Sequence, residues 1–197
     1  MGPVWNFVTD FGDSAVTVPL ALAVLIFLTT ARQRRLALSW ALAIGGCAVA
    51  IGTLKLVFGA CGERLTIAHL MSPSGHTAMS TAVYGSLALL VGARLPSRWR
   101  PAVMMATAVA ILAIALSRFA LHDHSPAEIM VGLVVGAGAV WVFHRRLRGH
   151  EAPGLPLRWL LLCGAGIIAV MHGTRWMIEP TVHRLAWDFR LDLPWCR

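Results

Sequence analysis

The stretch Ser72-Pro73-Ser74-Gly75-His76-Thr77 is a polar turn that stands directly before a long apolar run, 77–93. It predicts the start of a helix, because Ser72 or Ser74 can cap free amides and Pro73 suits a position that needs no donor. The first amides of a helix lack internal partners and carry the positive end of its dipole, which suits an anionic group such as phosphate. A capped helix start beside an incidental histidine is the alternative interpretation of the same residues.

Apolar residues dominate the chain on both sides of this turn. Of its 197 residues, 57% are hydrophobic and 13% are charged, and the mean hydropathy is +0.70. Because soluble domains carry about 25% charged residues, this composition predicts an integral membrane protein. The basic residues stand in short clusters and form no continuous stripe, so no nucleic-acid partner is predicted.

Six apolar runs approach the length of about 20 residues that a helix needs to cross a bilayer. They are 15–31, 36–58, 77–93, 102–121, 127–143 and 157–172. No alternating strand pattern competes with them. The prediction is an all-α, six-transmembrane-helix bundle that forms a single polytopic membrane domain over 1–197. Glycine stripes that let helices pack closely are predicted at Gly45-Gly46 and at Gly132, Gly136 and Gly138.

The arginines between these runs predict the orientation. Alternate loops, which begin at Arg32, Arg94 and Arg145, hold ten of the 17 basic residues and one of the nine acidic ones. Because positively charged loops stay in the cytoplasm, both termini and the turn at His76 are predicted to face the periplasm or exterior of the inner (cytoplasmic) membrane. The N-terminal segment before Ala15 has no basic residue, so we expect no cleaved signal peptide.

The segment 174–197 mixes tryptophans with charged residues, which is typical of the membrane–water interface. It predicts an interfacial C-terminal tail, and a lid over the outer face is a second interpretation. The four cysteines show no metal-binding spacing. Cys61 and Cys196 fall on the same predicted side, where a disulfide and a reduced pair are both compatible with the sequence.

Ionisable groups at membrane depth are costly, so each of them is a candidate for function. Three segments bring such groups to one outer level: Lys55 with Arg64, the turn at His76, and the stretch from Arg118 to Glu128, which includes His124. The cations and the helix amides can cradle a phosphoryl group, while the two histidines supply a nucleophile or base and an acid. Glu128 follows His124 by four residues, about one helical turn, and can hold its imidazole.

The same residues favour one reaction class. The sequence has neither a second carboxylate cluster for magnesium nor a glycine-rich phosphate loop. The prediction is therefore phosphoryl transfer through a phosphohistidine, with no metal and no cofactor.

Two motifs resemble those of the type 2 phosphatidic acid phosphatase superfamily, in its membrane lipid phosphatase branch. They are Pro73-Ser74-Gly75-His76, and Ser117-Arg118, five residues, His124, three residues and Glu128. The resemblance implies a six-helix bundle that removes phosphate from a lipid phosphate or diphosphate without metal. It implies that His124 is the nucleophile, that Glu128 orients it and that His76 is the general acid. The implied phosphate-binding residues are Lys55, Arg64, Ser74, Gly75 and Arg118.

Two departures from the family pattern stand out. Glu128 occupies a position that is usually Asp, and Ser125-Pro126-Ala127-Glu128 is also a plain helix-capping box. The family's first motif is Lys, six residues, Arg-Pro, whereas here Gly62 stands seven residues after Lys55 and Arg64 is the nearest arginine.

The lipid substrate and the phosphate acceptor are open at this point. Candidate substrates are phosphatidic acid, phosphatidylglycerol phosphate and an isoprenyl diphosphate such as undecaprenyl diphosphate. A lipid phosphotransferase with the same intermediate and a non-catalytic lipid-head-group-binding membrane protein are the alternatives. The oligomeric state is not predicted.

Overall fold

The computed structural model describes residues 2–61, 72–148, 157–176, 181, 182 and 184. All regular elements in this part of the chain are helices, which confirms the all-α prediction. The elements in chain order are α1 (Gly2–Asp10), α2 (Ser14–Thr30), α3 (Arg34–Cys61), α4 (Gly75–Arg94), η1 (Ser97–Trp99), α5 (Arg100–Ala120), α6 (Pro126–Leu147) and α7 (Leu157–Met171). Helices α2 to α7 occupy the predicted apolar runs, and α1 is an additional helix that the sequence interpretation missed.

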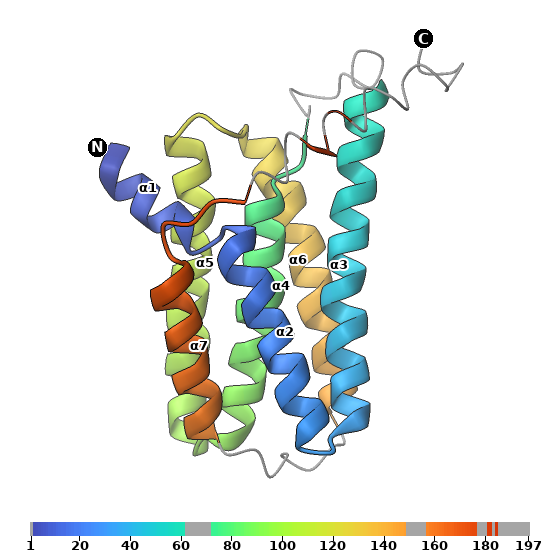
Figure 1. The fold of residues 1–197 in the computed structure, drawn as a ribbon, viewed down its shortest axis with the longest axis vertical. Coiled ribbons are helices and arrows are strands. Elements are labelled where there is room, and N and C mark those ends of the chain that lie inside the picture. The colour runs from blue at the N-terminus through green and yellow to red at the C-terminus, as the bar shows by residue number, and fades with distance from the viewer. Residues whose placement is uncertain (1, 62–71, 149–156, 177–180, 183, 185–197) are drawn as a thin grey trace.

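Helix α4 lies at the centre of the bundle and packs against α2, α3, α5 and α6 (Figure 1). Two of its hydroxyl groups are satisfied within the helix, since Ser80 and Thr81 both donate to the carbonyl of Thr77, at 3.2 and 2.6 Å, whereas the buried Ser86 hydroxyl has no hydrogen-bond partner among the described residues. Because α4 is enclosed by other helices, it tolerates more serine and threonine than a helix that faces lipid.

Several helices are long and apolar enough to cross a membrane, which indicates a membrane protein. By length and composition, four segments of the described chain qualify: Gly2–Thr30, Arg34–Gly59, Ser97–Ala120 and Pro126–Leu147. Helix α7 is apolar but shorter, with 15 residues. The less apolar α4 is not among the four.

The helices run up and down, so the connections divide between the two ends of the bundle. Figure 1 shows the α1–α2 corner, the start of α4, the α5–α6 turn and the end of α7 together at the upper end. The α2–α3 and α4–α5 connections lie at the lower end. The arginine clusters at Arg32 and Arg94 therefore lie opposite the end where α4 begins.

Helices α4 and α6 approach each other closely at two glycines. A Cβ atom on Gly132 would lie 2.6 Å from the carbonyl oxygen of Ser74, and one on Gly136 would lie 2.6 Å from that of Ala78. These two positions are where the predicted glycine stripe packs tightly. The prediction was wrong for the others: a Cβ atom added to Gly45, Gly46 or Gly138 would meet no described atom within 4 Å, so these glycines do not mediate helix packing here.

Candidate active site

Ser74 is the N-cap of α4, which decides between the two predicted caps. Its Oγ accepts a hydrogen bond from the amide of Thr77 at 3.4 Å and lies 3.0 Å from the Thr77 hydroxyl. The Ser74 side chain is fully buried. The helix begins at Gly75, so the amides of Gly75 and His76 belong to the first turn, where amides have no carbonyl partner within the helix.

Glu128 joins the starts of α4 and α6. Its Oε1 accepts from the amide of Ser72 at 2.6 Å, and its backbone carbonyl accepts from the amide of Ser74 at 3.1 Å. Its Oε2 lies 3.0 Å from Nδ1 of His124 and also accepts from the amide of Ser125 at 3.0 Å. The capping box and the contact with the imidazole therefore coexist, and the longer glutamate side chain serves both.

The turn between α5 and α6 fixes His124 relative to Arg118. The carbonyl of Arg118 accepts from the amides of Asp123 and His124, at 3.1 and 3.3 Å. His122 has a φ of 60°, a left-handed conformation that reverses the chain after α5. As a result, His124 is buried and only 8% exposed.

The guanidinium of Arg118 is buried and partly unsatisfied. Its Nη1 donates to Thr9 Oγ1 at 3.2 Å and lies 2.9 Å from Oδ2 of Asp123. Its Nε is buried and has no hydrogen-bond partner among the described residues. Because buried guanidinium donors are normally paired, this arrangement suits an anion that would take the remaining donor.

Lys55, Gly75 and His76 share the wall of a cavity of about 220 Å³. A Cβ atom on Gly75 would lie 3.3 Å from Cε of Lys55, so the glycine leaves room for the lysine against the start of α4. Trp176, which follows α7, lines the same cavity. Two predicted features lie outside the described residues: Arg64, and Cys196 with its pairing to Cys61. Most of the 174–197 tail also lies outside them.

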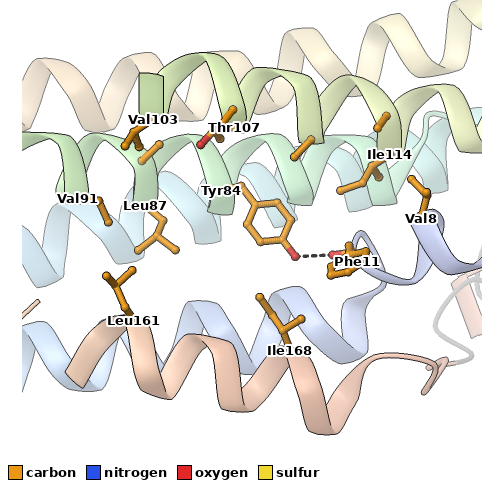
Figure 2. Close-up of a pocket in the computed structure, with 14 residues that line it drawn as sticks. Val8, Phe11, Tyr84, Leu87, Val91, Val103, Thr107, Ile114, Leu161 and Ile168 are labelled. Carbon is orange, nitrogen blue, oxygen red and sulfur yellow. Dashed lines mark hydrogen bonds between the residues drawn. The ribbon is translucent and has the colours of Figure 1, made fainter. Parts of the chain in front are cut away.

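A second, larger cavity is an apolar groove of about 620 Å³ between α1, α4, α5 and α7. Figure 2 shows Leu87 and Tyr84 facing Leu161 and Ile168 of α7 across this groove, with Phe11 at one end. The end at Phe11 is the end of the bundle where α4 begins. An aliphatic chain would be compatible with such a lining.

Two residues at this end of the bundle were not predicted to belong to the site. Oδ2 of Asp13 lies 3.3 Å from Nε2 of His76, and the Thr9 hydroxyl accepts from Arg118. The sequence offers one signal for Asp13: an acidic residue directly before a membrane-length run, at the same predicted outer level as His76. Its pairing with a residue 63 positions away required the tertiary structure.

No group of three or more His, Cys, Asp or Glu side chains able to hold a metal ion occurs among the residues that the structure describes. The donor set at this end of the bundle consists instead of cations, amides and single carboxylate–histidine pairs. Metal independence itself stays a prediction.

Comparison with known proteins gives relatives of two kinds. An uncharacterized 22.5 kDa protein in the cps region of Klebsiella pneumoniae is 31% identical over 140 residues, which cover 71% of this chain and 67% of that protein. Human glucose-6-phosphatase 3 is 31% identical over 134 residues, and the mouse protein of that name is 30% identical over the same length. The match covers 64% of this chain but only 36% of the human and mouse proteins. No solved structure matches the chain.

The profile of the PAP2 superfamily matches residues 57–150, a range that contains the start of α4, the α5–α6 turn and the His124–Glu128 pair. Together with the glucose-6-phosphatase relatives, this match supports a phosphatase of the PAP2 type. The chain belongs to the PAP2 superfamily.

Proposed function

We propose that this protein is a metal-independent membrane lipid phosphatase that works through a phosphohistidine at His124. The observation that carries the proposal is the shared role of Glu128, which contacts the His124 imidazole with one carboxylate oxygen and the chain before α4 with the other. This links a carboxylate-held imidazole to a helix start whose first amides have no carbonyl partner within the helix, which suits a phosphoryl group.

The first chemical step follows from the orientation of His124. Because Nδ1 faces Glu128, Nε2 is the nitrogen that attacks phosphorus, and the bond from phosphorus to the leaving oxygen breaks. His76 donates a proton to that oxygen, and Glu128 stabilises the positive charge that develops on the His124 ring. Water then attacks the phosphohistidine, gives a proton to His76 and releases inorganic phosphate, which restores both histidines.

Positive groups stabilise the charge on the phosphoryl oxygens in both steps. Arg118 supports this role through its buried Nε, which has no hydrogen-bond partner in the described part of the chain, and Lys55 through its place beside Gly75 and His76. Ser74 acts indirectly in this account, since its hydroxyl is engaged in capping and its contribution is to present the Gly75 amide. Arg64 is proposed as a further phosphate ligand on the family resemblance alone.

We propose six membrane crossings, α2 to α7, with the active site and both termini on the periplasmic or outer side of the cytoplasmic membrane. The arrangement of charge supports this orientation. Arginine clusters lie at the end of the bundle opposite the start of α4, and positive loops remain in the cytoplasm.

A lipid substrate is favoured by the apolar groove that ends near Phe11 (Figure 2). An acyl or isoprenyl chain would lie in this groove and exchange contacts with bilayer lipid for van der Waals contacts with the apolar lining. A sugar phosphate is a second candidate substrate, because two relatives carry the name glucose-6-phosphatase 3. A sugar has no apolar part to occupy the groove. Transfer of the phosphate to a lipid alcohol, rather than to water, would use the same intermediate.

The test is phosphate release by the purified protein in detergent micelles with EDTA present. Phosphatidic acid, an isoprenyl diphosphate and glucose 6-phosphate are compared as substrates. His124→Ala should abolish release, whereas His144→Ala, at the end of α6 beside Arg148, should not change it. Full activity of His124→Ala would refute the mechanism, and exclusive use of glucose 6-phosphate would refute the lipid assignment.

A further inference from the structure

The corner between α1 and α2, residues 9–14, contacts two residues of the candidate active site although no family motif includes it. Thr9 accepts a hydrogen bond from Arg118, and Asp13 faces His76. Both Thr9 and Asp13 are buried, at 3% and 4% exposure. A buried carboxylate is costly unless it is paired, so the contacts of Asp13 require an explanation.

The two carboxylate oxygens of Asp13 have different partners. Oδ1 accepts from the amide of Ala15 at 2.7 Å, which caps α2, and from the amide of Trp176 at 3.3 Å. Oδ2 lies 3.3 Å from Nε2 of His76. Helix capping therefore needs only one oxygen, and the second is directed at the imidazole.

The corner is anchored to its neighbours by several contacts. The hydroxyl of Tyr84 donates to the carbonyl of Phe11 at 2.6 Å, as Figure 2 shows, and this bond ties the corner to α4. A Cβ atom on Gly12 would lie 2.6 Å from Cγ2 of Ile114 and 3.5 Å from Cβ of His76, so the corner also packs directly against the histidine. Asp10 is fixed by Arg175, whose Nε donates to its Oδ1 at 2.9 Å.

We propose that Asp13 is a positioning residue for His76, and this inference rests on the proposed function. Its carboxylate accepts the Nε2 proton of the ring, holds the ring plane and leaves Nδ1 to carry the proton that goes to the leaving oxygen. A carboxylate that faces one ring nitrogen fixes the tautomer and stabilises the imidazolium, as in other histidine–carboxylate pairs. The two histidines of the site would then each have their own carboxylate, Asp13 for His76 and Glu128 for His124.

The test uses Asp13→Asn, because asparagine caps a helix about as well as aspartate and removes only the charge. Asp10→Asn is the matched control, since Asp10 belongs to the same segment, is also buried and contacts Arg175 instead of His76. The values of kcat and KM are measured with phosphatidic acid, whose alkoxide leaving group needs a proton, and with p-nitrophenyl phosphate, whose leaving group does not.

A positioning role predicts a selective loss. General acid catalysis contributes about 10²-fold or more, so Asp13→Asn should lower kcat for phosphatidic acid by about 10- to 100-fold, with KM unchanged. The rate with p-nitrophenyl phosphate should fall by less than about threefold. In a His76→Gln background, Asp13→Asn should have no further effect on kcat, because the two residues act as one unit. Asp13→Ser, which also retains a cap, provides a second variant if Asp13→Asn does not fold.

Several results would overturn this inference. An equal loss with both substrates, the same loss in Asp10→Asn, or an additive loss in the His76→Gln background would show that Asp13 acts only through folding. If the wild-type protein cleaves phosphatidic acid but Asp13→Asn matches it, the positioning role fails while the proposed function stands. If the wild-type protein cleaves neither substrate, the proposed function fails first and the role of Asp13 with it.

Discussion

Replacing Gly132 by alanine places a methyl group between α4 and α6 at the start of α4. Its carbon would lie 2.6 Å from the Ser74 carbonyl oxygen, where ordinary contact begins at 3.4 Å. The helices must therefore separate by about 0.8 Å at this point, and the atom in the way belongs to the backbone and cannot rotate aside. Overpacking of this kind costs about 1–3 kcal/mol, against a gain of up to about 1 kcal/mol from helix propensity.

The same displacement moves the first turn of α4 away from Glu128 and His124. Since a misplacement of about 1 Å can cost about 10²-fold in rate, kcat/KM for phosphatidic acid should fall by one to two orders of magnitude. Gly138→Ala is the matched control on the same helix, because its Cβ meets no described atom within 4 Å.

Thermal unfolding in detergent, followed by circular dichroism, and phosphate release are measured for both variants. Gly132→Ala should unfold at a lower temperature than the wild type, and Gly138→Ala at an equal or higher one. If Gly132→Ala is as stable and as active as Gly138→Ala, the close approach of α4 and α6 does not set the geometry of the site.

Three further outcomes are expected. Ala110→Phe fills part of the apolar groove at an exposed position of α5. The KM for long-chain phosphatidic acid should therefore rise severalfold, while the KM for p-nitrophenyl phosphate stays unchanged. An equal rise in both KM values would refute the role of the groove. Glu128→Gln keeps a capping side chain but removes the negative charge beside His124, so kcat should fall by about 10²-fold or more. A wild-type kcat in this variant would mean that Glu128 acts only as a helix cap. Ser74→Ala removes the cap of α4 and should lower stability by about 1 kcal/mol in chemical or thermal unfolding, whereas no change would mean that the cap is dispensable.

The helices and the contact between His124 and Glu128 could be predicted because they depend on local sequence. Apolar runs define α2 to α7, and the spacing of four residues brings His124, just before the N-cap Ser125, within 3.0 Å of Glu128 at the start of α6. Helix α1 was missed because it is short, with nine residues, and lacks a membrane-length apolar run of its own. The stripe at Gly45-Gly46 was wrong for another reason: small residues can also face the outside of a bundle, and sequence does not say which face has a neighbour.

The features that sequence could not supply are contacts between distant segments. The bond between Tyr84 and Phe11, the pairing of Asp13 with His76 and the apolar groove all join helices that are far apart in the chain. The two acids of the N-terminal segment were visible in the sequence, but only the fold shows their partners, Arg175 for Asp10 and His76 for Asp13.

The most direct test of the central claim is to identify the covalent intermediate. The purified protein is mixed with ³²P-labelled phosphatidic acid in the presence of EDTA, quenched within the first turnover and analysed for protein-bound phosphate. We predict label that is stable in alkali and labile in acid, as a phosphorus–nitrogen bond requires, located on the peptide that contains His124 and absent from His124→Ala. Turnover by the wild-type protein without any labelled His124, or label that persists in His124→Ala, would contradict the account.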